Sequence, residues 1–281
     1  MDIQKYKRYF SFNFFLYIFG RFKTIRYFYK KIQMIRNKSS KKIIKEENNK
    51  YLKFNLNVNL VKDELEHKGF YSGLELKDET LKYLIDLSNR SELVSTIDQK
   101  KFISFKEVND YNKSNDKPYC LLNLINPEIN NIAEKISRDK NLLDIANNYL
   151  GKVNNIDTRI QWSPVCIATD KWRELNQQTV TFHYDVHHLN FLYIFFYLTE
   201  CDKDSGAHEL IKGSHINKKF FKHLMGSARQ SLENLKKDYN QNDFIKIEEQ
   251  AGCGFIEDTS CYHRARAPKN KPRLALQFRY Y

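Results

Sequence analysis

The sequence predicts a mainly β domain with flanking helices, preceded by a helical N-terminal arm. From about residue 157 to the C-terminus, short segments rich in β-branched and aromatic residues alternate with turn-like stretches. Between about residues 65 and 150, apolar residues instead recur at helical spacing. Several short strands of this kind predict a sandwich or a barrel. We therefore expect an arm over 1–50 and one domain over 51–281, with helices in 65–150 and a β core in 157–281.

The arm carries most of the net charge of +13. The first 50 residues hold 14 of the 47 Lys and Arg residues, and their only acidic residues are Asp2, Glu46 and Glu47. The remainder of the chain is almost neutral. Basicity is therefore a property of the arm, and it gives little support to a nucleic-acid partner for the folded domain.

The pattern of the arm allows two interpretations. The apolar run over 9–19 is too short to span a bilayer, which needs about 20 apolar residues. It is followed over 21–36 by the pattern of a basic amphipathic helix. Residues 9–36 could lie on an anionic membrane surface, or the helix could dock on its own domain, and the pattern does not separate the two.

The expected location is the cytoplasm, free or at a membrane periphery. No small-residue cleavage site follows the apolar run, so a cleaved signal peptide is not expected. The five cysteines include no C-x-x-C pair, which favours a reducing compartment. The sequence does not indicate an oligomeric state.

The helices are expected in four places. Residues 78–90 form a helical pattern that Asp78 is placed to cap, and residues 128–138 form a second. A third covers 140–150 and is closed by Gly151, and a fourth interrupts the strands near 217–238. The strands are expected within 158–168, 178–186, 190–199, 243–249, 253–258 and 273–281.

Two of these strands bring metal-binding side chains to their ends. His183 and Asp185 are two residues apart, so their side chains leave a strand on the same side. His263, just after another strand, can complete the set. Two histidines and one carboxylate form the facial triad of non-haem Fe(II) oxygenases. Ten residues later, Arg273 begins the last strand after Pro272.

At this point the chain resembles the phytanoyl-CoA dioxygenase-like family of Fe(II)/2-oxoglutarate-dependent oxygenases. The resemblance rests on the H-Y-D of 183–185, on "DKDSGAHELIKGSH" at 202–215, and on "AGCGFIEDTSCYHRARAPKNKPRLALQFRY" at 251–280. It covers 157–281 well and the stretch from about residue 65 more faintly. It implies a double-stranded β-helix, which is a jelly-roll or cupin-like fold.

The resemblance also implies roles for individual residues. His183, Asp185 and His263 would bind Fe(II), and Arg273 would hold the far carboxylate of 2-oxoglutarate, to which a planar guanidinium can pair bidentately. The implied activity is a dioxygenase that uses O₂ to hydroxylate a C–H bond of a small-molecule, lipid-linked or sugar-linked substrate and releases succinate and CO₂. No catalytic residue beyond the metal ligands is expected.

The sequence departs from the family pattern at two positions. Ala265 stands where a hydroxyl residue often touches the cosubstrate carboxylate, and Thr181, Gln161 or Ser163 are candidates to replace that contact. Lys212 replaces the usual proline of the "GSH" turn, either as a charge near an anionic substrate or as a solvated lysine.

The remaining residues of the motifs receive structural roles. Gly206 and Gly213 would serve turns, and Ser214 and His215 would shape the rim of the site. His187 and His188 are given no role as ligands.

Two other classes of protein stay open. A catalytically inactive jelly-roll binding module has no need for all three ligands and the arginine. A nucleic-acid oxidative demethylase would explain the basic arm, but the near-neutral domain and the "GSH" turn count against it.

Overall fold

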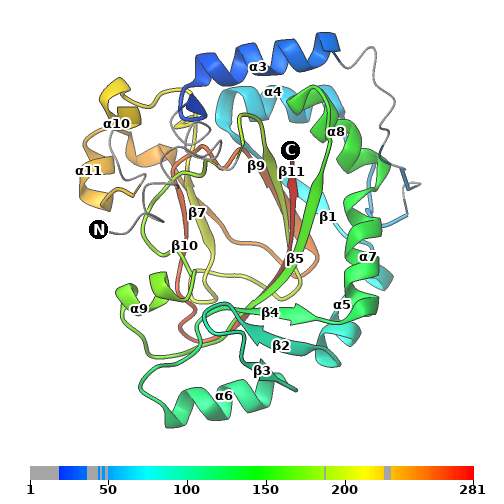
Figure 1. The fold of residues 1–281 in the computed structure, drawn as a ribbon, viewed down its shortest axis with the longest axis vertical. Coiled ribbons are helices and arrows are strands. Elements are labelled where there is room, and N and C mark those ends of the chain that lie inside the picture. The colour runs from blue at the N-terminus through cyan, green and yellow to red at the C-terminus, as the bar shows by residue number, and fades with distance from the viewer. Residues whose placement is uncertain (1–18, 37–43, 45, 48–49, 187, 225–228) are drawn as a thin grey trace, which may run out of the picture.

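A computed structural model describes residues 19–36, 44, 46–47, 50–186, 188–224 and 229–281. Two antiparallel sheets face each other in it (Figure 1). The large sheet has the strand order β1-β9-β6-β11-β5-β4-β2-β3, and the small sheet has the order β10-β7-β8. This mainly β architecture with flanking helices confirms the predicted jelly-roll fold.

The strands are short, and β5 and β11 are the longest. Their bounds are β1 Phe70–Glu75, β2 Glu92–Ser95, β3 Lys101–Phe102, β4 Leu122–Ile125, β5 Ile156–Ser163, β6 Leu192–Tyr197, β7 His208–Ile211, β8 Phe244–Ile247, β9 Cys253–Glu257, β10 His263–Ala265 and β11 Arg273–Tyr280. The helices are α3 Lys23–Arg36, α4 Val58–Lys68, α5 Asp78–Asn89, α6 Phe105–Ser114, α7 Pro127–Ser137, α8 Lys140–Leu150, α9 Asp170–Leu175, α10 Phe220–Leu224 and α11 Leu232–Lys236, with a 3₁₀ turn at Gln241–Asp243.

The chain crosses between the sheets after β9, so β9 belongs to the large sheet and β10 to the small one. Beside β10, an isolated bridge pairs His183 with His263 and adds the 178–186 segment to the edge of the small sheet. The predicted metal ligands therefore lie between the two sheets.

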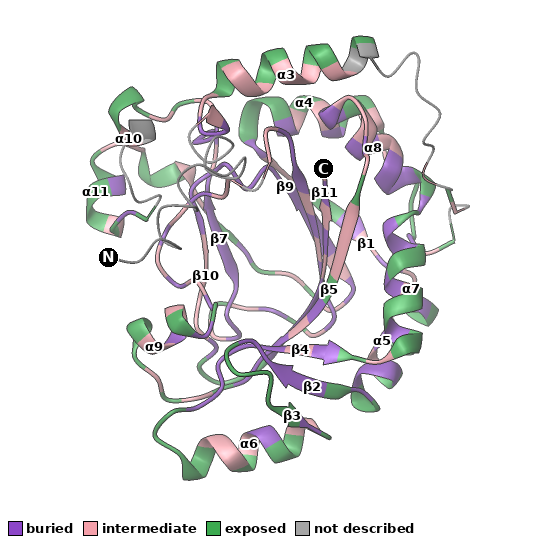
Figure 2. Cartoon of the chain, in the orientation of Figure 1, coloured by how far each residue is buried: buried purple, intermediate pink, exposed green. Residues whose placement is uncertain are grey.

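Helices α4, α5, α7 and α8 pack along the outer side of the large sheet (Figure 1). Leucine and isoleucine side chains fill the space beneath them, and a separate cluster that includes Tyr197, Leu210 and Phe255 fills the space between the sheets. Figure 2 shows the buried residues concentrated along these inner strands. The site therefore lies between two packed sheets, and the segment that carries His183 and Asp185 is attached to β10 by an isolated bridge.

The predicted helices are present with small changes at their ends. Helices α7 and α8 match the predictions within one residue, and Gly151 ends α8 with φ +91° and an N–H bonded to the carbonyl of Asn147. Asp78 was expected as a cap, but Lys77 occupies that position and Asp78 pairs with Lys53 at 2.8 Å. The single helix expected near 217–238 is represented by two short helices, α10 and α11, and residues 225–228 lie outside the described part of the chain.

The strand predictions need three corrections. The stretch 65–150, predicted as helical, also supplies β1, β2, β3 and β4 to the large sheet. The segment 178–186, predicted as a strand, makes only the bridges at Phe182 and His183. Strand β7 lies in a stretch for which no strand was predicted, because all four of its residues are buried and show no alternation.

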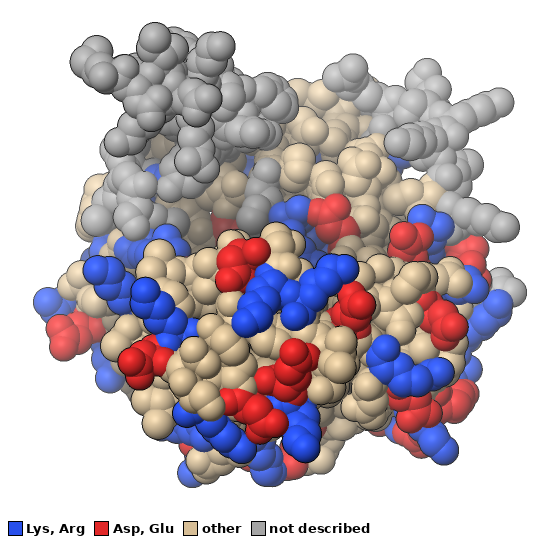
Figure 3. Space-filling view, turned by 60° about the horizontal axis from the view of Figure 1, so that its bottom comes forward, with Lys and Arg blue, Asp and Glu red and all other residues tan. Residues whose placement is uncertain are grey.

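The arm docks on the domain through α3, which lies over α4 (Figure 1). Of the segment 9–36, for which membrane contact was considered, residues 9–18 lie outside the described part of the chain. Among the helices that the structure describes, none is both long enough and apolar enough to cross a bilayer. On the face of the domain that Figure 3 shows, Lys and Arg side chains are interspersed with Asp and Glu, as expected for a near-neutral domain.

Candidate metal centre

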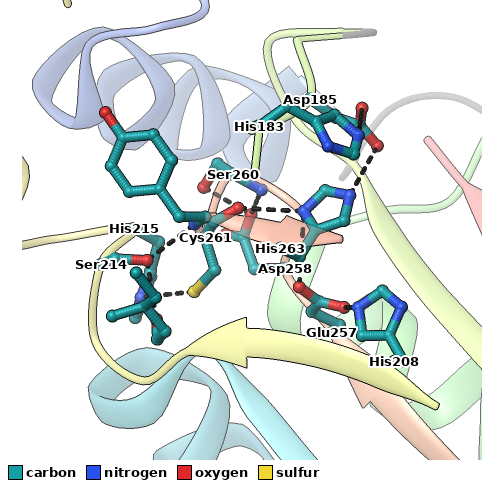
Figure 4. Close-up of polar contacts among 12 residues, drawn as sticks. His183, Asp185, His208, Ser214, His215, Glu257, Asp258, Ser260, Cys261 and His263 are labelled. Atoms are coloured by element: carbon teal, nitrogen blue, oxygen red, sulfur yellow. Dashed lines mark hydrogen bonds and ion pairs between the residues drawn. The ribbon is translucent and has the colours of Figure 1, made fainter. Parts of the chain in front are cut away.

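Three side chains converge between the sheets. Ligand atoms of His183, Asp185 and His263 all lie within 4.8 Å of one another. The Nε2 atoms of His183 and His263 lie 3.7 and 3.8 Å from the two carboxylate oxygens of Asp185. Figure 4 shows the two imidazoles and the carboxylate pointing toward one another. This arrangement is a 2-His-1-carboxylate cluster.

Backbone pairing holds the cluster together. His183 and His263 exchange N–H···O=C bonds of 2.9 and 2.8 Å, and the N–H of Asp185 donates to the carbonyl of Thr259 at 2.8 Å. The site is thus built by pairing two segments about eighty residues apart in sequence.

The other ring nitrogen of each histidine is also fixed. His183 Nδ1 lies 3.1 Å from the carbonyl oxygen of Thr181, and His263 Nδ1 lies 3.0 Å from that of Cys261. A carbonyl only accepts, so each Nδ1 carries the proton and each Nε2 lone pair is free to point into the cluster.

Burial keeps both histidines neutral. It lowers the pKa of His183, against the opposing effect of Asp185. Burial and the neighbouring His183 lower the pKa of His263 to about 4. Since a metal binds the neutral imidazole, both rings are in the binding form at neutral pH.

A second pair of titratable groups lies behind His263. Glu257 is fully buried, and its carboxyl oxygens lie 3.6 Å from His263 Nδ1 and 2.6 Å from His208 Nε2 (Figure 4). Neither oxygen has an aligned hydrogen-bond donor among the described residues. Burial therefore dominates and raises the pKa of Glu257 to about 8, while burial and Arg273 lower the pKa of His208 to about 3.

Arg273 is buried at the start of β11 and faces the same cavity. Its guanidinium donates to the carbonyl of Gly206 and, at 3.3 Å, to the hydroxyl of Ser163. Gly206 has φ +87°, and a Cβ there would lie 2.8 Å from the carbonyl of Arg266, so the turn that presents this carbonyl requires glycine. The guanidinium is therefore oriented by the protein and keeps further N–H groups for a ligand.

The cluster and Arg273 line one cavity of about 310 Å³. Gln161 also lines it, with its side-chain amide engaged by Asn123 and Gln277. Thr181 is not among the lining residues, and Thr179 is. Thr181 is two residues before His183, but this spacing does not bring its side chain to the same cavity, because the 178–186 segment is not a continuous strand.

Ser214 and His215 stabilise a loop instead of entering the cluster. The Ser214 hydroxyl accepts from the N–H of Tyr262 at 2.7 Å, and His215 lies 3.2 Å from the carbonyl of Glu66 and 3.4 Å from the Cys261 thiol. These contacts agree with the structural role expected for His215.

The other basic residues of the motifs also lie away from the cluster. Lys212 lies 3.7 Å from Asp243 and does not line the cavity. The His188 ring stacks on Tyr281, and His187 lies outside the described residues.

Sequence reasoning missed His208 and Glu257. His208 is opposite Ala265 in the β7–β10 pairing and lines the cavity. The sequence between Gly206 and the "GSH" turn shows no strand pattern, so it does not indicate which way the His208 side chain points. For Glu257, the only signal was a carboxylate inside an otherwise apolar strand, "CGFIE".

The donor set fits Fe(II). Two neutral imidazole nitrogens and one carboxylate oxygen suit a divalent first-row metal. The cavity of about 310 Å³ that they line leaves room for a cosubstrate. Arg273, in the same cavity, suits a carboxylate.

Comparison with known proteins shows a similarity of fold. No protein-family model matches the sequence, and no curated protein sequence matches it. SnoN, a non-heme alpha-ketoglutarate-dependent epimerase from nogalamycin biosynthesis, aligns over 79% of this chain and 82% of its own with a TM-score of 0.51 and 10% identity. EvdO2 from Micromonospora carbonacea var. aurantiaca aligns over 79% of this chain and 89% of its own, with a TM-score of 0.49 and 13% identity. EctD from S. alaskensis, solved with 2-oxoglutarate and 5-hydroxyectoine, aligns over 78% of this chain and 74% of its own, with a TM-score of 0.49 and 12% identity.

The likeness to SnoN places the chain in the same fold as that 2-oxoglutarate-dependent enzyme. The phytanoyl-CoA dioxygenase-like family itself remains a resemblance of motifs.

Proposed function

We propose that the protein is a non-haem Fe(II)- and 2-oxoglutarate-dependent dioxygenase that hydroxylates a C–H bond of a small-molecule, lipid-linked or sugar-linked substrate and forms succinate and CO₂. The observation that supports it best is the convergence of His183, Asp185 and His263 in one cavity with Arg273. Bound Fe(II) would supply the activation of O₂.

The protein's own residues have separable tasks in this proposal. His183 and His263 hold the metal through Nε2, and Asp185 adds the negative charge that balances it. Arg273 binds the far carboxylate of the cosubstrate in a buried place, where a charge-assisted pair is strong. Aromatic side chains, which include Phe195, form part of the cavity lining and would limit the access of water to a bound metal.

His208 is the residue that replaces the missing hydroxyl at position 265. The small Ala265 side chain leaves space opposite it in the β7–β10 pairing, and the His208 imidazole occupies the cavity wall there. We propose that it contacts the cosubstrate carboxylate held by Arg273. His208→Leu should then raise the 2-oxoglutarate concentration needed for half-saturation without abolishing metal binding.

The test is anaerobic titration with Fe(II) and 2-oxoglutarate followed by visible absorption. The wild type should develop a metal-to-ligand charge-transfer band, and His183→Ala and Asp185→Ala should lose it. Arg273→Leu should retain metal binding, measured by equilibrium dialysis, but require more 2-oxoglutarate. His67→Ala, in an exposed histidine on α4, is the matched control and should behave as the wild type.

The contrary outcome is a wild type that binds neither Fe(II) nor 2-oxoglutarate. That result would favour the inactive jelly-roll binding module.

A further inference from the structure

Helix α3 docks on the domain with its basic side. Arg26 donates to both carboxylate oxygens of Asp258, at 3.0 and 3.2 Å, and its guanidinium lies 4.8 Å from the centre of the Phe191 ring. Lys30, one turn later, lies 3.6 Å from Glu66 of α4 and 5.0 Å from the centre of the Tyr149 ring. These contacts fix which side of α3 faces outward.

The outward side of α3 is apolar. Phe28, Ile32 and Ile35 are 61%, 52% and 73% exposed. At 100° per residue they lie within about 60° of one another, opposite Arg26 and Lys30. A helix that docks on its own domain normally turns its apolar side inward, and α3 does the reverse.

Helix α10 extends this surface. Phe220 and Phe221 are 68% and 55% exposed, and the Phe220 ring lies 6.0 Å from that of Phe22 beside α3. We define the α3–α10 face by its exposed apolar residues: Tyr27, Phe28, Ile32, Ile35, Phe220 and Phe221. Figure 1 shows α10 beside the N-terminal end of α3.

Positive charge accompanies the α3–α10 face. Lys31 is exposed on α3 and, at 100° per residue, lies within about 60° of Phe28 and Ile35. The first 50 residues hold 14 Lys and Arg against three acidic residues. The charge favours an anionic partner, and it disfavours a second copy of the chain, because pairing through this face would bring two basic arms together.

We propose that the α3–α10 face binds the surface of an anionic lipid bilayer. The apolar side chains would enter the boundary between headgroups and acyl chains, and Lys31 would lie among the anionic headgroups. Binding of this kind is peripheral and needs no spanning helix. It does not depend on the function proposed for the metal centre.

The test is sedimentation of the full chain with vesicles of phosphatidylcholine alone and of phosphatidylcholine mixed with phosphatidylglycerol. The wild type should bind the mixed vesicles, bind the neutral vesicles much less, and be released by salt. The triple variant F28S/I32S/I35S should bind the mixed vesicles more than about tenfold less tightly. Lys31→Gln should weaken binding to the mixed vesicles only.

The matched control is I103S/I125S/I167S. These isoleucines are 79%, 44% and 99% exposed and lie outside α3 and α10. The control should bind as the wild type, and thermal unfolding should show that both triple variants are folded.

Three results would overturn the proposal. The first is no binding of the wild type to mixed vesicles, and the second is equal binding by F28S/I32S/I35S. The third is a concentration-dependent dimer in size-exclusion chromatography that F28S/I32S/I35S abolishes, which would identify a second copy as the occupant.

Discussion

Two adjacent carboxyl groups, Glu257 and Asp258, are both buried at the end of β9 but have opposite protonation behaviour. Asp258 accepts hydrogen bonds from Arg26, Tyr149 and Ser260. Burial would raise its pKa, but Arg26 and these hydrogen bonds hold the pKa well below its usual range. No described residue gives Glu257 an aligned donor, and burial raises its pKa to about 8. The comparison indicates that a hydrogen-bonded cation, and not the extent of burial, determines whether each of these carboxyl groups is ionised.

The largest effect is expected from removing the cation. Arg26→Ala leaves the Asp258 carboxylate buried without its counter-ion and should lower the free energy of unfolding by about 3–5 kcal/mol. Urea unfolding followed by tryptophan fluorescence measures the change. Lys31→Ala removes an exposed cation from the same helix and should cost less than about 0.5 kcal/mol. Equal losses in the two variants would contradict the role given to Arg26.

Glu257→Gln should instead raise the free energy of unfolding. In the metal-free protein at pH 7, Glu257 is protonated in the folded state and ionised in the unfolded chain, so folding includes the cost of proton uptake. A glutamine is neutral in both states, and the variant should be more stable by about 1–3 kcal/mol. Urea unfolding in the presence of a chelator tests this, and a clear destabilisation would show that Glu257 is ionised and paired.

The difference in stability between Glu257→Gln and the wild type should depend on pH. The pKa of Glu257 is raised from 4.5 to about 8, so its favourable contribution is complete below about pH 4.5 and is lost as pH rises to 8. The stability of Glu257→Gln relative to the wild type should therefore increase by up to about 1.4 kcal/mol per pH unit between pH 5 and 8. The contribution of Asp258 has the opposite sign and should be lost below about pH 4. A pH-independent difference would mean that the carboxyl group of Glu257 does not titrate on unfolding.

The smallest effect is expected at Tyr149, whose hydroxyl donates to Asp258 at 2.7 Å. Tyr149→Phe removes this bond but leaves Arg26 and Ser260 in place, so about 1–2 kcal/mol should be lost. Tyr83→Phe, on an exposed side chain, is the control. A loss as large as that of Arg26→Ala would show that the hydroxyl, and not the guanidinium, keeps Asp258 ionised.

The sequence predicted the centre of the site better than its surroundings. His183, Asp185, His263 and Arg273 could be found because their chemistry is specific to a few residue types in a set order. Their mutual position also survives the loss of a regular strand over 178–186, because one bridge at His183 suffices to align the two segments.

The surroundings depend on tertiary contacts that local patterns do not encode. Strand β7 is four residues long and buried throughout, so it shows no period-two pattern, and the position of His208 could not be inferred. The helical pattern of 21–36 predicted α3 but not which side docks. That choice depends on the distant Asp258 and Glu66, which pair with Arg26 and Lys30.

The bridge between His183 and His263 also bears on the order of folding. The ligand set cannot exist until two segments separated by about eighty residues have closed the edge of the small sheet, and closing so long a loop is slow and entropically costly. Metal affinity should therefore report on completion of the fold, and a bound ion should selectively slow the opening of this sheet edge, which hydrogen exchange at the His183 and His263 amides can follow.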